Sequence, residues 1–228
     1  MTIRLLAPAG PIVDGRLATV SARLRVPDAG GLATWRWDDG AHDDEPVASG
    51  TFIRASRTHR YAAPGVYRVR VQVGDEGEAA EERYVTVARP GQVAASGWVR
   101  DVERAERIAF GFLIAPGVDG APDAIILRAL LGGLELSSNQ LEWLMTSQPG
   151  SLHFGGLASL GAAPADHPYR VDVLRVAAAR GRSAQRMTMS VYAPGAVPGH
   201  DSPTHRATGI VRPGHIALGP FEALEPIP

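Results

Sequence analysis

The residues best suited to chemistry form an acidic stretch around position 40. Asp38, Asp39, Asp43, Asp44 and Glu45 lie close together in the sequence. Carboxylate oxygens are the ligands that a hard cation such as calcium takes in proteins. The stretch lacks the regular spacing of an EF-hand loop, and acidic β-turns are also common as solvated tips. Asp38, Asp39, Asp43 and Asp44 are therefore a calcium candidate, with a solvated turn as the alternative.

A second polar segment covers residues 200–205 and contains His200, Asp201 and His205. These side chains could hold a metal ion or supply part of a hydrolytic triad. Residues five apart on an extended loop face no common point, however, and the sequence has no Gly-x-Ser-x-Gly or His-Glu-x-x-His motif. The sequence therefore favours a protein that is not an enzyme and that needs no cofactor.

The amino-acid composition excludes several classes of chemistry. The chain has no cysteine, which excludes disulfides, thiolate nucleophiles and zinc ribbons. It also has no lysine, so every basic residue is arginine, and Schiff-base and P-loop lysines are excluded. The formal net charge is −1, and no segment concentrates positive charge. Nucleic acid is thus not an expected partner.

We expect the acidic stretch to be held in place by the β-strands next to it. Trp35 and Trp37 share one face of a strand, and Asp38-Asp39-Gly40 closes that strand with turn residues. Farther along, apolar residues alternate with polar ones, which is the period of a half-exposed strand. The apolar positions of that strand are Tyr67, Val69, Val71 and Val73.

These two segments resemble the PKD domain, an immunoglobulin-like β-sandwich of surface and secreted proteins. The family pattern runs W-x-F-G-D-G and then H-x-Y-x-x-x-G-x-Y-x-V-x-L-x-V-x-D, and this chain has WRWDDG at 35–40 and HRYAAPGVYRVRVQVGD at 59–75. The resemblance implies that Asp39 accepts hydrogen bonds from backbone N–H groups of its turn and that His59 supports the fold. From the strand face that it occupies, Trp35 is expected to lie in the core.

The rest of the chain indicates a second all-β domain. Frequent Gly and Pro favour short strands, and paired glycines at 132–133 favour a hairpin or a bulged strand over a helix within 125–136. The segments 136–144 and 151–156 resemble an all-β module that follows PKD domains in bacterial surface proteins. We expect two β-sandwich domains in tandem: 1–88 PKD-like, 89–92 a linker, and 93–228 a jelly-roll-like or other sandwich with an extended C-terminal arm.

The C-terminal arm is the expected interaction site. Phe221, Leu224 and Ile227 recur every third residue between prolines, so they line one side of an extended ribbon. Such an apolar stripe needs a groove, and we expect a neighbouring subunit to provide it. Glycan binding stays open, with Tyr192, Trp98 and Phe221 as the aromatic candidates for stacking.

The first residues, 1–8, lack the apolar run and cleavage site of a secretory signal, and no segment is long enough to insert into a membrane. A surface-type fold without a signal indicates a structural or adhesive protein of a virion, such as a bacteriophage head decoration, fibre or tail protein. Its partners would be its own copies or other subunits. The alternative is a secreted or cell-surface module that binds matrix or polysaccharide. Both place the protein on a virion or an extracellular surface.

Overall fold

The computed structural model describes residues 2–8, 10–26, 30–74, 79–101, 106–116, 122–146, 150–177, 183–212 and 216. All secondary-structure elements in these ranges are β-strands. The all-β class predicted from the sequence is therefore confirmed. Among the described residues, no helix has the length and apolar character needed to cross a membrane.

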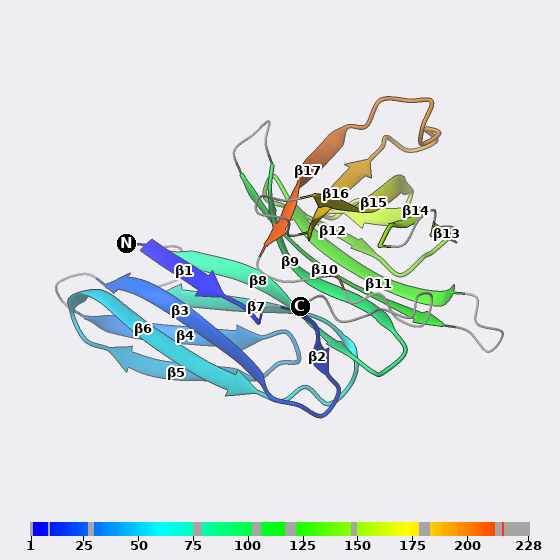
Figure 1. Cartoon of the computed structure of the whole chain (residues 1–228). Coiled ribbons are helices and arrows are strands. Elements are labelled where there is room, and N and C mark those ends of the chain that lie inside the picture. The colour runs from blue at the N-terminus through cyan, green and yellow to red at the C-terminus, as the bar shows by residue number, and fades with distance from the viewer. Residues whose placement is uncertain are drawn as a thin grey trace.

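The first half of the chain forms two sheets. The three-stranded sheet has the order β1-β3-β6, and the five-stranded sheet has the order β2-β8-β7-β4-β5. Their bounds are β1 Thr2–Leu6, β2 Ile12–Val13, β3 Ala18–Val26, β4 Gly31–Trp37, β5 His42–Val47, β6 Gly50–His59, β7 Gly65–Val73 and β8 Ala80–Ala88. We call this half the sandwich, because one apolar core joins the two sheets (Figure 1).

The sandwich core follows from the alternation in the sequence. Trp35 is fully buried and Trp37 nearly so, with their rings stacked at 6.4 Å between centroids. The neighbouring strand β7 buries three valines on the same side of the sheet: Val69, Val71 and Val73. The core position predicted for Trp35 is therefore confirmed.

The second half of the chain is one continuous sheet of nine strands, ordered β12-β11-β10-β9-β17-β16-β15-β14-β13. The bounds are β9 Val93–Arg100, β10 Arg107–Pro116, β11 Pro122–Leu131, β12 Leu134–Ser138, β13 Trp143–Met145, β14 Leu152–Leu160, β15 His167–Ala177, β16 Ser183–Val191 and β17 His205–Arg212. Of the two alternatives expected here, the hairpin is present: β11 and β12 join at Gly132 and Gly133, which have φ of 58° and 83°. Two successive positive φ angles are what a tight hairpin turn requires.

This sheet closes on itself, which the sequence did not predict. Besides β11, β12 also pairs with β14 through Leu136↔Leu160 and Ser137↔Ser159. The result is a barrel of eight strands, and β13 lies on the other part of the same β14 edge. The expected second sandwich or jelly roll is replaced by this barrel, because the pairing of β12 with β14 joins what would be two open sheet edges.

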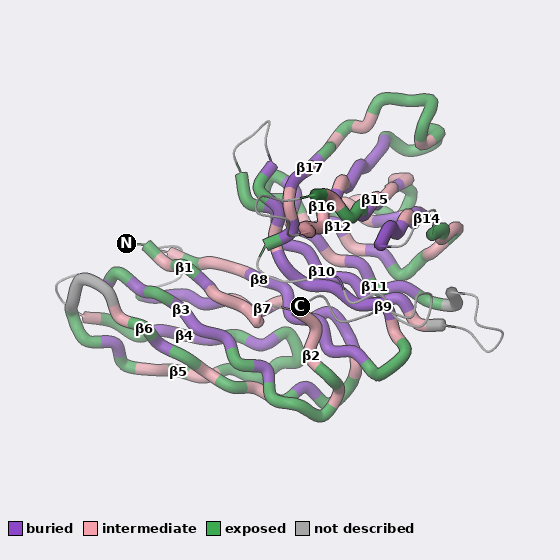
Figure 2. Tube along the Cα trace, in the orientation of Figure 1, coloured by how far each residue is buried: buried purple, intermediate pink, exposed green. Residues whose placement is uncertain are grey.

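Aromatic side chains fill the barrel, as expected for a barrel of this strand number. Phe110, Phe112, Phe154 and Tyr169 are all fully buried. The rings of Phe112 and Phe154 lie 5.1 Å apart in an edge arrangement. Figure 2 shows the buried residues concentrated along the barrel strands and along β7 and β8 of the sandwich. The barrel therefore has its own apolar core, separate from that of the sandwich.

A third and smaller apolar cluster joins the sandwich to the barrel. β8 and β7 face β9, β10 and β11 (Figure 1), and β8 is buried on both faces from Tyr84 to Ala88. The cluster comprises Val66, Tyr84 and Ala88 of the sandwich and Ala94, Ala109, Leu113 and Leu130 of the barrel. We call this contact the junction. Because it buries side chains of both halves, it holds them in one relative orientation.

Candidate functional site

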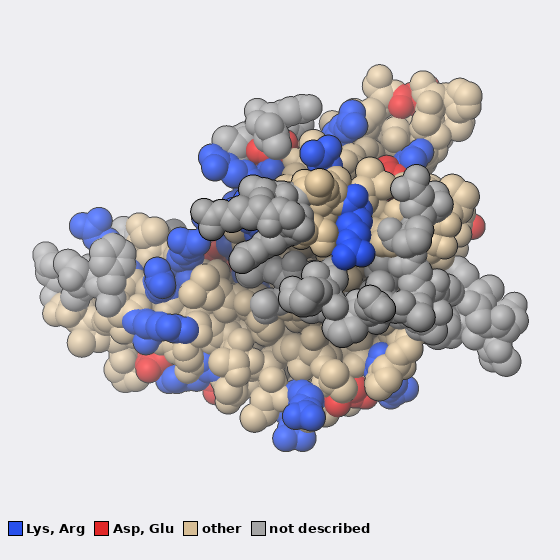
Figure 3. Space-filling model, in the orientation of Figure 1, with Lys and Arg blue, Asp and Glu red and all other residues tan. Residues whose placement is uncertain are grey.

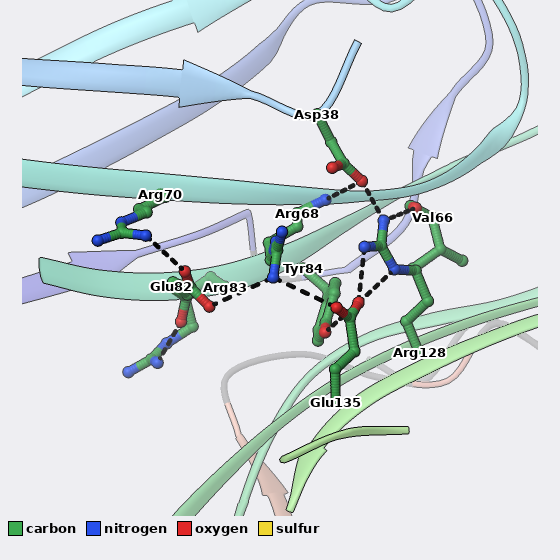
Figure 4. Close-up of polar contacts among 9 residues, drawn as sticks. All are labelled: Asp38, Val66, Arg68, Arg70, Glu82, Arg83, Tyr84, Arg128 and Glu135. Carbon is green, nitrogen blue, oxygen red and sulfur yellow. Dashed lines mark hydrogen bonds and ion pairs between the residues drawn. The ribbon is translucent and has the colours of Figure 1, made fainter. Parts of the chain in front are cut away.

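A polar network borders the junction and links the two halves (Figure 4). Arg128 of β11 donates to Asp38 of the sandwich through Nη1. The same guanidinium binds Glu135 of β12, with Nε to Oε1 at 2.8 Å and Nη2 to Oε1 at 2.6 Å. Arg68 of β7 reaches Glu135 at 3.3 Å, and the Tyr84 hydroxyl donates to Glu135 at 3.2 Å. Ion pairs thus cross the junction in both directions.

The network is partly shielded from water. The side chain of Arg128 is 20% exposed and that of Asp38 is 24% exposed. Burial lowers the pKa of Arg128, but hydrogen bonds to Glu135 and Asp38 outweigh that effect, so the pKa is raised. Burial and the nearby charge of Glu135 raise the pKa of Tyr84. Arg128 therefore stays charged and keeps its ion pairs with Asp38 and Glu135. Tyr84 stays neutral and keeps the proton that it donates to Glu135.

A pocket of about 310 Å³ opens beside the same junction, where β1 and β8 meet the barrel. Four arginines from four strands line it: Arg4, Arg83, Arg107 and Arg212. The guanidinium of Arg107 lies over the Trp98 ring, 4.8 Å from its centroid. The remaining lining residues are Leu5, Leu6, Ala7, Pro8, Tyr84 and Gly97. On the face shown in Figure 3, basic side chains lie on both halves beside this junction.

Arg83 is the buried member of this set, with a side chain that is 8% exposed. It pairs with Glu81, whose other oxygen accepts a hydrogen bond from the backbone N–H of Leu5 at 2.5 Å. Burial lowers the pKa of Arg83, and the positive charges of Arg107 and Arg4 add to that effect against the opposing charge of Glu81. The arginines of the pocket therefore repel one another, and the pocket is suited to an anion.

Residues 3–88 match the PKD domain family. No curated protein and no solved structure matched the chain. The sandwich therefore agrees with the family suggested by the WRWDDG and HRYAAPG segments, and this match indicates a surface or adhesive module. It does not extend to the barrel, so the nature of the second half rests on its structure.

We call the sandwich the PKD domain from here on, after the family model that it matches. Its acidic residues make separate contacts. Asp38 contacts Arg128 and accepts from the backbone N–H of Arg68 at 3.2 Å. Asp39 accepts from the N–H of Ala41 at 3.2 Å and binds His59 Nε2 at 2.6 Å. The turn role expected for Asp39 is thus present, and His59 supports the fold by holding that turn.

The other two calcium candidates lie on a strand. Residues 42–46 belong to β5, because a tight turn after Trp37 returns the chain to pair with β4. Asp43 accepts a hydrogen bond from Trp37 Nε1 at 2.8 Å. Asp44 is exposed. Because the two residues are adjacent in a strand, their side chains point to opposite faces of the sheet. No group of three metal-ligating side chains occurs among the described residues, and a calcium site here stays a prediction from the sequence.

The other predicted site residues have different outcomes. Phe221, Leu224 and Ile227 lie outside the described residues. Tyr192 is buried, so its ring is not a stacking platform. Trp98 is half-buried and lines the arginine pocket. In the 200–205 segment, Asp201 accepts from the backbone N–H of Val197 at 2.7 Å and so serves its own loop.

Arg128→Met should weaken the attachment of the PKD domain to the barrel. Removing the guanidinium leaves Asp38 and Glu135 partly buried without their main partner, at a cost of about 1–2 kcal/mol. Calorimetry is expected to separate the unfolding of the two halves into distinguishable steps. Arg186→Met is the control, because Arg186 is exposed on β16. An Arg128→Met transition identical to that of the parent would contradict a holding role.

Acid should destabilise the protein through two carboxylates with lowered pKa. Burial raises the pKa of Asp39, but hydrogen bonds from His59 and Ala41 outweigh it. Burial also raises the pKa of Asp172, but Arg170 and His153 outweigh it. Each group therefore contributes stability above its usual pKa of 3.8, and that stability is lost as the pH falls through the lower folded value. Denaturant titrations from pH 6 to pH 2 should show a shallower loss for Asp172→Asn, and an unchanged slope would refute this assignment.

Proposed function

We propose that the protein is a non-enzymatic structural or adhesive surface protein whose exposed loops and sheet faces make protein–protein contacts. The observation that carries this proposal is the junction. An apolar cluster and the Asp38–Arg128–Glu135 network fix the PKD domain against the barrel. A unit of fixed geometry presents its surface at defined angles, which is what a displayed or load-bearing component needs.

The specific form that we propose is a component of a bacteriophage virion, such as a head decoration, fibre or tail protein. Its support is the fold typical of exteriors together with the fixed junction, which suits repeated display in a regular assembly. The partners would be further copies of this chain or other subunits of the particle.

Imaging of native particles with a labelled antibody against this chain tests the location. Regular labelling of particle surfaces is expected. Labelling confined to cell surfaces or to secreted material would reject the virion and favour the alternative below.

Deletion of residues 219–228 tests the expected contact through Phe221, Leu224 and Ile227, which lie outside the described residues. The truncated chain is expected to keep its melting temperature and to lose incorporation into the assembly. Unchanged incorporation with a lowered melting temperature would mean that the segment packs on its own chain.

The second candidate function is a secreted or cell-surface module that binds matrix or polysaccharide. The arginine pocket favours it, because this pocket combines several positive charges with an aromatic ring in a concave surface. Binding to immobilised polysaccharides, compared with uncoated beads, tests this candidate independently of any particle.

A further inference from the structure

We propose that the arginine pocket beside the junction binds an acidic sugar, a uronic-acid ring whose carboxylate pairs with the arginines while its apolar face contacts the apolar and aromatic lining. This inference deepens the second proposed function and rests on it. The pocket is not part of the PKD sequence signature, because both halves of the chain contribute to it: Arg4 and Arg83 from the PKD domain, and Trp98, Arg107 and Arg212 from the barrel.

The charge of the pocket is the first support. Arg83 is matched by Glu81, but Arg4, Arg107 and Arg212 have no ion-pair partner among the described residues. All three are exposed, so their guanidinium groups are available to a ligand. A guanidinium binds a carboxylate with two parallel hydrogen bonds, which makes arginine a strong and geometrically selective partner for this anion.

The positions of the arginines are the second support. Trp98 and Arg212 are paired residues on neighbouring strands β9 and β17. Arg107 lies over the Trp98 ring at 4.8 Å, which restrains a long side chain in one place. Arg83 is held by Glu81 and by the backbone carbonyl of Glu82 at 2.7 Å. Restrained donors lose less conformational freedom on binding than free ones, so the pocket is partly organised before a ligand arrives.

Size and lining favour a sugar over an acidic peptide. The volume of about 310 Å³ is at the lower end of the range for small-molecule sites and suits one or two rings. Leu6, Ala7 and Pro8 give the pocket an apolar lining, and Trp98 adds an aromatic ring, one face of which Arg107 covers. The C–H face of a pyranose packs on such surfaces, whereas an extended acidic peptide needs a long groove or a sheet edge.

Calorimetric titration of the full chain with trigalacturonate tests the inference, with galactotriose as the neutral probe. We expect saturable binding of the acidic trisaccharide that weakens as sodium chloride is added, and no binding of the neutral one. Arg107→Gln and Arg212→Gln should each reduce affinity about tenfold, since each removes a charged donor. Arg206→Gln is the matched control, because Arg206 is exposed on the same strand as Arg212 but does not line the pocket.

The outcomes separate this inference from the function on which it rests. No saturable binding of trigalacturonate up to about 10 mM would overturn it, as would an Arg206→Gln effect equal to that of Arg212→Gln. Tighter binding of hexaglutamate than of trigalacturonate would identify an acidic protein segment as the ligand and overturn the sugar. If immobilised polysaccharide retains the parent and Arg212→Gln equally, the binding module stands and the pocket proposal falls. If no polysaccharide retains the parent, the second function falls as well.

Discussion

Trp35→Ala is expected to destabilise the PKD domain by about 3–5 kcal/mol, the cost of removing a large buried aromatic side chain. The Trp35 side chain is fully buried between the two sheets, next to Trp37. Its Nε1 has no hydrogen-bond partner among the described residues, so the loss is one of packing. Guanidinium unfolding followed by circular dichroism measures the change.

Leu32→Ala is the matched control for Trp35→Ala, because Leu32 lies on the same strand and is 47% exposed. It should change the free energy of unfolding by less than about 0.5 kcal/mol. A Trp35→Ala variant that unfolds at the parental guanidinium concentration would show that the ring is not in the core, and would make Trp35 a candidate for ligand contact.

Gly111→Ala is expected to destabilise the junction by about 3 kcal/mol, at the upper end of the range for overpacking. Gly111 lies on β10 where the barrel faces the PKD domain. A Cβ at this position would lie 2.6 Å from Val66 Cγ1 and 3.1 Å from both Thr86 Oγ1 and Tyr84 Cβ. Thr86 is itself held by a 2.6 Å hydrogen bond to the carbonyl of Ala95. The Val66 side chain must therefore shift, and because Tyr84 and Thr86 also crowd the added methyl group, we expect the halves to move apart.

Two measurements check the Gly111→Ala prediction. Small-angle scattering should give a larger radius of gyration than for the parent, and proteolysis should be faster at residues 89–92, which connect β8 to β9. Val66→Ala removes the atom closest to the added methyl group, so Gly111→Ala combined with Val66→Ala should recover part of the loss. Identical scattering for parent and Gly111→Ala would show that the junction is looser than described.

The sequence predicted the PKD domain well because its signals are local. The alternation of Tyr67, Val69, Val71 and Val73 marks one buried face, and the turn at Asp38–Gly40 ends a strand within a few residues. Barrel closure has no such signal. A strand with one buried face has the same period-two pattern in a sandwich and in a barrel, and the two are distinguished by the pairing of β12 with β14.

The candidate sites were harder to predict. The sequence offered Asp38 as a cation ligand and gave no sign that Arg128 faces it across the junction. The pocket arginines come from four strands that are separated along the chain, β1, β8, β10 and β17, and they form no linear motif. One signal was available: from Tyr84 to Ala88 the sequence has no charged residue, unlike the alternation with Arg68 and Arg70 in β7. A strand without a polar face indicates burial on both sides, and β8 does contact the barrel.

The sheet edges of this protein bear on its behaviour at high local concentration. Exposed strand edges can pair with those of neighbouring molecules and produce aggregates. In the barrel, closure between β12 and β14 removes most of this hazard, and β13 has only three residues. In the PKD domain, β5 is an outer strand, and its sequence is His42-Asp43-Asp44-Glu45-Pro46-Val47. Three carboxylates repel a second copy, and the proline has no N–H to donate. Many copies crowded together would therefore resist uncontrolled pairing through the β5 edge.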